Sequence, residues 1–283
     1  MNSAVIILYF NKINMTSECI NSVIDAGIPM SQIFAFSNGS DIAFHKELKN
    51  RFPSIGHNHI EVNGGFSGGF NNSLKWIFSL GFTSALFLTN DTIMGKNALD
   101  ECIITSSESG SGFIAPTIHY FRKPDKIDSC SGYFDRKRLT LSHYHSTDLP
   151  LYLNPDDYIP GTALFISADV FKKTGGMDES FHTYWDDVDI SFRAHKSDIK
   201  QARCFKADIY HKVGQTCHKK PLYTTFYFQR NKILFCKKYL HGEELNIALK
   251  KISTEIDILF DKANSDNNTQ KQKYIEEIKL LLE

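Results

Sequence analysis

The sequence predicts an α/β protein with a mostly parallel, doubly wound central sheet and helices on both faces. Three observations lead to this fold. Short apolar runs alternate with helical patterns through the first half of the 283 residues. The runs are apolar throughout, which is typical of strands that are covered on both faces. Each run is followed by a polar segment, and ligands bind at the carboxyl ends of the strands in such sheets.

The first half contains four expected strands with helices between them. The strands are VIILYF (5–10), IFAF (33–36), HIEV (59–62) and ALFL (85–88), and the helices are 16–26, 41–51 and 70–80. Thr16 is expected to cap the first helix. The polar segments that follow the strands are Asn11, SNGSD (37–41), NGGFSGGFNN (63–72) and TNDT (89–92). We expect them to converge on one ligand.

The second half has a different pattern. Its expected elements are shorter strands and loops over 113–167, a strand at 161–167, a strand at 202–211, and helices from about 221 that end in an amphipathic segment at 269–282. Ser167 is expected to cap a short helix that ends near Gly175. The sequence therefore predicts a domain of residues 1–220 and a C-terminal helical region of residues 221–283.

Composition excludes several classes of function. Lys+Arg and Asp+Glu balance at 32 each, so no overall charge recruits nucleic acid as a partner. The six cysteines contain no CxxC pair, which argues against a zinc ribbon or a disulfide framework and for reduced thiols in a cytoplasm. The apolar run at 4–10 is too short to span a bilayer and is expected to be a buried strand, so the expected location is cytoplasmic.

Two polar strand ends have competing interpretations. NGGFSGGFNN matches neither the P-loop nor the dinucleotide fingerprint, although its glycines allow close backbone approach to a ligand; the alternative is a flexible connection. In TNDT, Asp91 is placed to hold a divalent cation, and the alternative is a helix N-cap at Asp91 or Thr92. His211, at the end of a later strand, is a candidate ligand. HYH (143–145) lacks a nearby carboxylate and is disfavoured as a metal pair.

WDDVDISFR (185–193) places three carboxylates at the start of a helix. Asp186, Asp189 and Arg193 share one helical face, where Arg193 is expected to neutralise the carboxylates. Acidic residues in a first turn also complement the helix dipole. Asp187 points about 100° away from Asp186 and lacks that partner. Asp187 is therefore the free carboxylate and the candidate for chemistry.

Taken in order over residues 3–216, these motifs resemble the inverting GT-A glycosyltransferases of family 2, including rhamnosyl- and galactofuranosyltransferases. The resemblance implies a GT-A fold, a nucleotide-diphosphate sugar donor and Mg²⁺ or Mn²⁺. TND matches the family's DxD motif with Thr89 in place of its first Asp, so the implied metal residues are Asp91 and His211. Ser37 stands where the family usually has an Asp, which leaves the base open. The Trp-Asp-Asp form resembles the galactofuranosyltransferase branch.

The resemblance also implies the site residues. Asp187 is the candidate base that takes the acceptor's proton in a single displacement, with Asp186 second. The residues expected to contact the nucleotide sugar are Phe10, Asn11, Ser37, Asn38, Gly64, Gly65, Phe66, Gly69, Asn71, Asn90, Gly161, Thr162 and Trp185. The expected function is a cytoplasmic hexosyltransferase that extends a bacterial surface polysaccharide on a saccharide or lipid-linked saccharide. Two alternatives remain: a catalytically inactive nucleotide-sugar-binding or scaffold protein, and, less favoured, a nucleotidyltransferase.

Residues 219–240 combine many aromatic residues with six Lys or Arg. Such a face is suited to peripheral contact with the inner membrane, where lipid-linked acceptors reside. The alternatives are a helix that packs on the preceding domain with solvated lysines, and a homo-oligomer formed through the last helix.

Overall fold

A computed structural model describes residues 2–213, 221–265 and 268–282. The chain divides into two compact units: one comprises Met1–Glu179 and Asp186–Gln215, and the other Ser180–Trp185 and Thr216–Glu283. Ser180–Trp185, which lies within the expected domain 1–220, therefore groups with the C-terminal helices. Cys217 and the remainder of 214–220 lie outside the described residues.

The first unit is built on a nine-stranded sheet with the order β3-β2-β1-β4-β11-β6-β12-β5, in which β7 also pairs with β6. Its strands are β1 (Ser3–Tyr9), β2 (Ile33–Asn38), β3 (Gly56–Ile60), β4 (Ser84–Thr89), β5 (Thr92–Met94), β6 (Phe113–Tyr120), β7 (Lys123–Ser129), β11 (Ala163–Ser167) and β12 (Gln201–His211). The pairs β3–β2, β2–β1, β1–β4 and β6–β12 are parallel. β11 is antiparallel to both of its neighbours. A small second sheet contains β10 (Asp157–Tyr158), β8 (Gly132–Asp135) and β9 (Thr140–His143).

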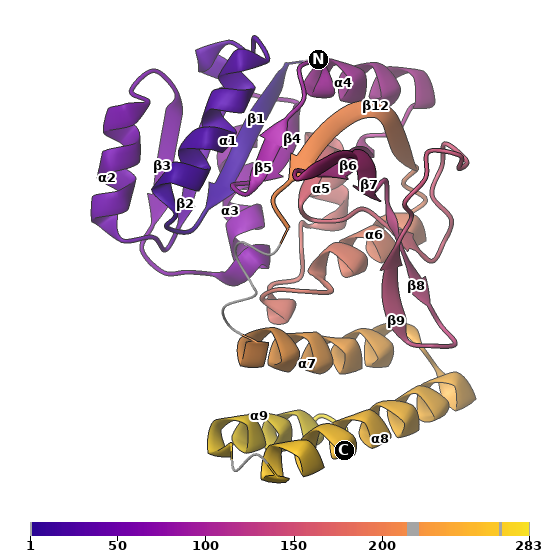
Figure 1. The fold of residues 1–283 in the computed structure, drawn as a ribbon. Helices are drawn as coiled ribbons and strands as arrows, with labels where there is room; N and C mark the ends of the chain where they lie inside the picture. The colour runs from indigo at the N-terminus through magenta and orange to yellow at the C-terminus, as the bar shows by residue number, and fades with distance from the viewer. Residues whose placement is uncertain (1, 214–220, 266–267, 283) are drawn as a thin grey trace. The chain divides into compact units, whose positions relative to one another are not determined.

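Helices cover both faces of the large sheet, as the fully apolar strands predicted (Figure 1). Ile7 of β1 belongs to the core on one face, with α1 (Ile13–Asp25), α2 (Ile42–Arg51) and α4 (Ala98–Ser109). Its neighbour Ile6 belongs to the core on the other face, with α3 (Gly65–Ser79), α5 (Ala168–Thr174) and α6 (Asp186–Lys196). Because alternate strand residues enter opposite cores, neither face of β1 is exposed to solvent.

Two expected helix starts are wrong. α1 begins at Ile13, so Thr16 lies inside its first turn, and its hydroxyl donates to the Lys12 carbonyl at 3.1 Å. α3 begins at Gly65, about one turn before the expected 70, so most of the glycine run is helical. The reason is close packing: a Cβ on Gly69 would lie 2.6 Å from Asn38 Nδ2. The predicted Ser167 cap is confirmed, since its hydroxyl accepts from Val170 N at 3.2 Å.

The second unit contains the helices α7 (Pro221–Tyr239), α8 (Gly242–Ser265) and α9 (Thr269–Lys279). Ile275 and Ile278 of α9 are buried, in line with the predicted amphipathic segment. Lys232 of α7 forms an ion pair with Glu255 of α8 at 2.7 Å. None of the helices in the described part of the chain combines the length and the apolar character that crossing a membrane requires.

Candidate active site

The acidic pair at the start of α6 receives hydrogen bonds from two other elements. Asp186 is 2% exposed, and its Oδ2 accepts from the hydroxyl of Ser67, on α3, at 2.7 Å. Asp187 is half-buried, and its Oδ2 accepts from the backbone N–H of Gly161 at 3.0 Å. The helical glycine run and the segment before β11 thus fix the two carboxylates.

The pair is suited to holding a proton near neutral pH. Burial, together with the charge of Asp187, raises the pKa of Asp186 to about 7, although the Ser67 hydroxyl opposes the rise. Burial also raises the pKa of Asp187, against the hydrogen bonds from the Gly161 and Val188 amides. Two adjacent carboxyl groups that do not readily ionise together titrate as a coupled pair. A carboxyl with such a pKa is a competent acid–base group at neutral pH.

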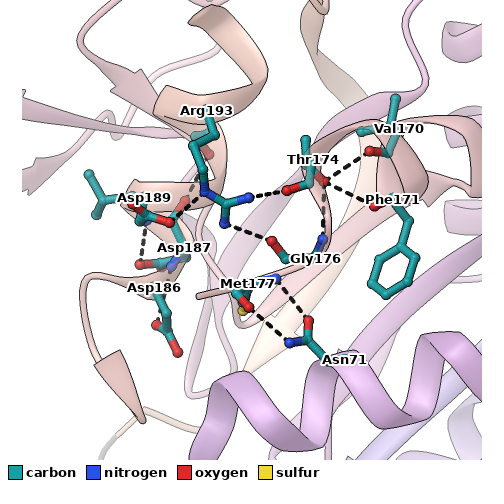
Figure 2. Close-up of polar contacts among 12 residues, drawn as sticks. Asn71, Val170, Phe171, Thr174, Gly176, Met177, Asp186, Asp187, Asp189 and Arg193 are labelled. Carbon is teal, nitrogen blue, oxygen red and sulfur yellow. Dashed lines mark hydrogen bonds and ion pairs between the residues drawn. The ribbon is translucent and has the colours of Figure 1, made fainter. Parts of the chain in front are cut away.

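Asp189 has a different partner from this pair, the guanidinium of Arg193 (Figure 2). Its Nε lies 2.7 Å from Asp189 Oδ2, so the predicted pairing with Asp189 is confirmed. The predicted neutralisation of Asp186 by Arg193 is wrong, because the guanidinium is turned to the carbonyl groups of Thr174 and Gly176. Asp189 and Arg193 therefore brace α6 against the end of α5, and Asp186 turns to α3 instead.

A second acidic cluster lies at the ends of β4 and β12. Asp91 Oδ2 lies 3.6 Å from Nε2 of His211, and Nδ1 of the same imidazole lies 3.3 Å from Asp128 Oδ2. Thr89 Oγ1 donates to Asp91 Oδ1 at 2.6 Å, so the residue in place of the expected first Asp of DxD binds the carboxylate of the second. The alternative of an N-cap here is wrong, because Thr92 begins β5.

The carboxyl pKa shift in this cluster is opposite in direction to those of the Asp186–Asp187 pair. Burial lowers the pKa of His211, but hydrogen bonds and charge from Asp128 and Asp91 outweigh it and raise that pKa to about 9. For Asp128, burial raises the pKa, and the hydrogen bonds with His211 and Tyr120 outweigh it, so the pKa falls. An imidazole held through Nδ1 by one carboxylate, with Nε2 turned to another, has the arrangement in which histidine binds metals.

Sequence reasoning missed Asp128 and set aside His143. Asp128 carries no recognisable motif, and only the antiparallel pairing of β7 with β6 brings it beside His211. His143 lies on β9; burial lowers its pKa, while the charges of Asp128 and Asp187 act against that effect. The pKa of the His143 imidazole thus depends on carboxylates of both acidic clusters. KIDS (126–129) has a single apolar residue, Ile127, which is too little alternation to predict a strand there.

Three of the polar residues expected at the strand ends are hydrogen-bonded within the protein. Ser37 Oγ hydrogen-bonds to His59 Nδ1 at 2.9 Å. Asn38 accepts from Gly64 N at 3.1 Å and donates to the Gly65 carbonyl at 2.7 Å. Asn90 Nδ2 donates to Thr16 Oγ1 at 2.9 Å. These side chains hold the strand ends to neighbouring elements.

The other expected contact residues differ in exposure. Phe10 is 45% exposed, and Asn11 next to it has a φ of 53°. Asn71 is buried and exchanges two hydrogen bonds of 2.8 Å with the backbone of Met177 (Figure 2). Trp185 is 1% exposed, and its ring packs on Phe228 and Phe235 of α7.

Glycine is required at 161. A Cβ there would lie 2.7 Å from the Phe66 ring, so any side chain would displace that ring. The carbonyl group of Thr162 accepts from Thr89 N at 3.0 Å and so ties this segment to the end of β4. The segment 161–162 therefore links the two acidic clusters through its backbone, with Gly161 bound to Asp187.

A cavity of about 560 Å³ adjoins His211. Its lining is mostly cationic or aromatic: Met15 and Glu18 of α1, Tyr120–Lys123 and Lys126 of the β6–β7 hairpin, and His211–Val213. Lys212 forms an ion pair with Glu18 and lies 5.0 Å from the centre of the Phe121 ring. A cavity with this charge suits an anionic group better than a neutral one.

Within the described residues, no three or more His, Cys, Asp or Glu side chains are grouped as a ready metal site. The donor set of Asp91 and His211 still fits one divalent cation whose remaining positions are filled by phosphate oxygens and water. The orientation of His211 by Asp128 is the observation that favours this fit.

No protein-family model matches the chain. Among curated proteins, the chain is 23% identical to the low-salt glycan biosynthesis hexosyltransferase Agl10 of Haloferax volcanii over 172 residues, which are 54% of this chain and 51% of Agl10. It is 28% identical to the uncharacterized protein Rv1525 of Mycobacterium tuberculosis over 155 residues, which are 52% of this chain and 54% of Rv1525. The chain thus spans about half the length of the curated relatives it matches.

Solved structures show the fold. The mannosyltransferase PcManGT from Pyrobaculum calidifontis, in complex with GDP-Man and Mn²⁺, superposes with a TM-score of 0.60 at 9% identity over 99% of this chain and 86% of its own. GalNAc-T7 with UDP, GalNAc and Mn²⁺ superposes with a TM-score of 0.56 at 13% identity, over 74% of this chain and 43% of its own. TarS (1–349) of S. aureus superposes with a TM-score of 0.53 at 15% identity, over 86% of this chain and 67% of its own. The expected GT-A fold is confirmed.

Proposed function

We propose that the protein is a glycosyltransferase that moves a sugar from a nucleotide-diphosphate donor to a saccharide or lipid-linked saccharide. The observation that carries the proposal is the juxtaposition of two electrostatically opposite clusters in one GT-A unit. Asp186 and Asp187 form a protonatable pair, and Asp91 with His211 forms a cation-binding pair. Sugar transfer needs both: a base for the acceptor hydroxyl and a stabiliser for the departing diphosphate.

Asp187 is the proposed base. Its carboxylate is half-buried, whereas that of Asp186 is 2% exposed and bound to Ser67. In a single displacement the acceptor oxygen bonds to the anomeric carbon as the bond to the diphosphate breaks, and the hydroxyl proton passes to Asp187. This route inverts the configuration at the anomeric carbon. Asp186 modulates the proton affinity of its neighbour from the buried side.

Asp91 and His211 are the proposed ligands of Mg²⁺ or Mn²⁺, with Asp128 orienting the imidazole. When bound, the ion supplies Lewis-acid stabilisation of charge on the leaving diphosphate. The neighbouring cavity, with Arg122, Lys123 and Lys212 in its lining, provides additional positive charge for an anionic group. The strand ends at Asn11, Asn38 and Asn90, together with Gly64–Phe66, are the proposed floor for the nucleotide.

The finer specificity is proposed from sequence. Trp185-Asp186-Asp187 makes galactofuranosyl donors the first to test, followed by rhamnosyl donors. Mannosyl and N-acetylgalactosaminyl donors come next, since the structural neighbours were solved with GDP-Man and with UDP and GalNAc. The proposed process is bacterial surface polysaccharide synthesis, in the cytoplasm or against the inner membrane.

The experiment is a panel of these nucleotide sugars, measured by thermal shift with and without Mn²⁺ and then by product formation. A bound ligand raises the melting temperature, so one donor is expected to stabilise the protein more when Mn²⁺ is present. That donor is then expected to be hydrolysed slowly, or transferred when an acceptor is supplied. No stabilisation by any donor would refute the proposal.

The second candidate is a catalytically inactive nucleotide-sugar-binding protein. The observation in its favour is Thr89, whose hydroxyl donates to Asp91 where a DxD motif would place another carboxylate. This candidate predicts saturable donor binding with no hydrolysis and no transfer. Mn²⁺-dependent turnover of any donor would exclude it.

A further inference from the structure

Ser180–Trp185, the segment that leads directly into Asp186, is bound by one residue of α7. Asn231 is fully buried, and its Nδ2 donates to the carbonyl oxygens of Phe181 and Thr183 at 2.7 Å and of Tyr184 at 2.9 Å. A single side-chain amide thus binds three backbone carbonyl groups within four residues, of which that of Phe181 also accepts from Thr183 N at 2.7 Å. Buried carbonyl groups of this kind need such partners.

The backbone of this segment is in an unfavourable conformation. His182, Tyr184 and Trp185 have φ angles of 61°, 65° and 69°, which place three residues with side chains in the left-handed region that favours glycine. Such conformations persist only where the surroundings over-determine them. Without the Asn231 hydrogen bonds, the segment is expected to relax to other backbone angles.

Other contacts from α7 hold the side chains of the segment. The His182 ring stacks on Tyr227 with centroids 4.9 Å apart. The Trp185 ring lies 5.1 Å from that of Phe235. Arg230 Nη1 donates to the Ser180 carbonyl at 2.8 Å. The helix therefore contacts the segment from its first residue to its last.

We propose that Asn231 is a positioning residue for the Asp186–Asp187 pair, an inference that rests on the proposed role of Asp187 as the base. Asn231 fixes the backbone of Ser180–Trp185, and the peptide bond from Trp185 to Asp186 passes that constraint to the first residue of α6. The consequence is that α7 adds a backbone constraint at the start of α6 to the hydrogen bonds from Ser67 and Gly161 that hold the carboxylates. A misplacement of roughly 1 Å at a reacting group costs about 100-fold in rate.

The test compares Asn231→Ala with Lys232→Met, its neighbour on α7. Lys232→Met breaks the ion pair with Glu255 on α8 and touches no residue of Ser180–Trp185 in the described contacts. Both variants weaken the packing of α7, so the second controls for lost stability. With the full chain below the melting temperature of each variant, Asn231→Ala is expected to lower kcat about 100-fold. Its KM for the donor should stay within about 2-fold, because the proposed nucleotide floor lies outside Ser180–Trp185 and Trp185, expected from sequence to contact the donor, is 1% exposed and packs on α7.

Amide hydrogen exchange across 180–188 gives a readout that is independent of turnover. Asn231→Ala is expected to speed exchange there, and Lys232→Met is not. Equal kcat loss in the two variants, or wild-type kcat or exchange in Asn231→Ala, would overturn the proposal. If Asn231→Ala does not fold, Arg230→Met removes the bonds to the Ser180 carbonyl and to Asn231 Oδ1, and is expected to act more weakly in the same direction. Unchanged kcat and exchange would again overturn the proposal. If the wild-type protein shows no turnover, the proposed function is refuted. Hydrogen exchange in Asn231→Ala then still tests whether Asn231 orders Ser180–Trp185.

Discussion

At the start of α6, Asp186 and Asp187 lie next to each other and are bound by a hydroxyl and a backbone amide, whereas at the ends of β4 and β12 two carboxylates flank the imidazole of His211. The first arrangement raises carboxyl pKa values, and the second lowers that of Asp128 and raises that of the imidazole. Carboxylates thus keep a proton more readily in the first place and stabilise a charged imidazole in the second. What differs is the imidazole that lies between Asp91 and Asp128.

Asp187→Asn is expected to have the largest effect. Removing the proposed base is expected to lower kcat about 10³-fold while donor binding is retained, since general-base catalysis contributes on this scale. Steady-state transfer and donor titration measure the two quantities. Asp169→Asn, on the exposed side of α5, is the matched control. Normal turnover by Asp187→Asn would assign the base elsewhere.

Asp91→Asn tests the second cluster. Loss of a ligand carboxylate is expected to weaken Mn²⁺ binding about 100-fold and to lower kcat with it, because an amide oxygen carries no charge to neutralise the ion. Calorimetric titration with Mn²⁺ measures the affinity, and Asp100→Asn on α4 serves as the control. Unchanged affinity would remove Asp91 from the metal site.

Asp128→Asn tests the orientation of the His211 imidazole and leaves the proposed ligands Asp91 and His211 in place. It is expected to weaken Mn²⁺ binding about 10-fold, as loss of a partner that orients a ligating histidine does. In metal-free protein, the raised pKa of His211 stabilises the fold fully below pH 6.5, and this contribution is lost as the pH rises through about 9. Asp128→Asn should flatten that loss in the free energy of unfolding, measured by denaturant titration. Asp125→Asn, exposed on the same hairpin, should leave the profile unchanged.

Ser67→Ala is the smallest expected change. The Ser67 hydroxyl lowers the pKa of Asp186, so its removal lets Asp186 keep its proton to higher pH. A neutral Asp186 does not repel the charge on Asp187, so the proposed base ionises more readily, and the acid limb of the kcat–pH profile should move downward by up to about one pH unit. The maximal rate should change little. A profile that moves upward, or not at all, would contradict the coupling of Asp186 to Asp187.

The sequence predicted the strands best where the chain is fully buried. β1, β2 and β4 match the expected runs within about two residues, because an unbroken apolar run is a strong signal for a strand covered on both sides. β3 and the start of α3 are displaced, since GHNHI is polar and the glycines of α3 read as a loop. Gly69 is required by its close contact with Asn38, and only the packed helix reveals that role.

In the candidate site, sequence identified the groups at strand and helix ends but could not assign their partners. Asp187 and the Asp91–His211 pair followed from motif and order. Asp128 did not, because its place depends on the register of β7 against β6. Ser67 replaced Arg193 as the partner of Asp186, because helical spacing cannot show which neighbouring element offers a hydroxyl.

The grouping of Ser180–Trp185 with the C-terminal helices also has a consequence for the order of synthesis. Asn231 follows Tyr184 by 47 residues, so the ribosome releases the segment well before its partner exists. Domains generally fold as the chain emerges, N-terminal part first. The sheet and its helices can therefore assemble early, while the approach to Asp186 acquires its left-handed conformation only after α7 is made. Activity is expected to be the last property that the nascent protein acquires, and a chain that ends before α7 should keep the sheet while lacking an ordered acidic pair.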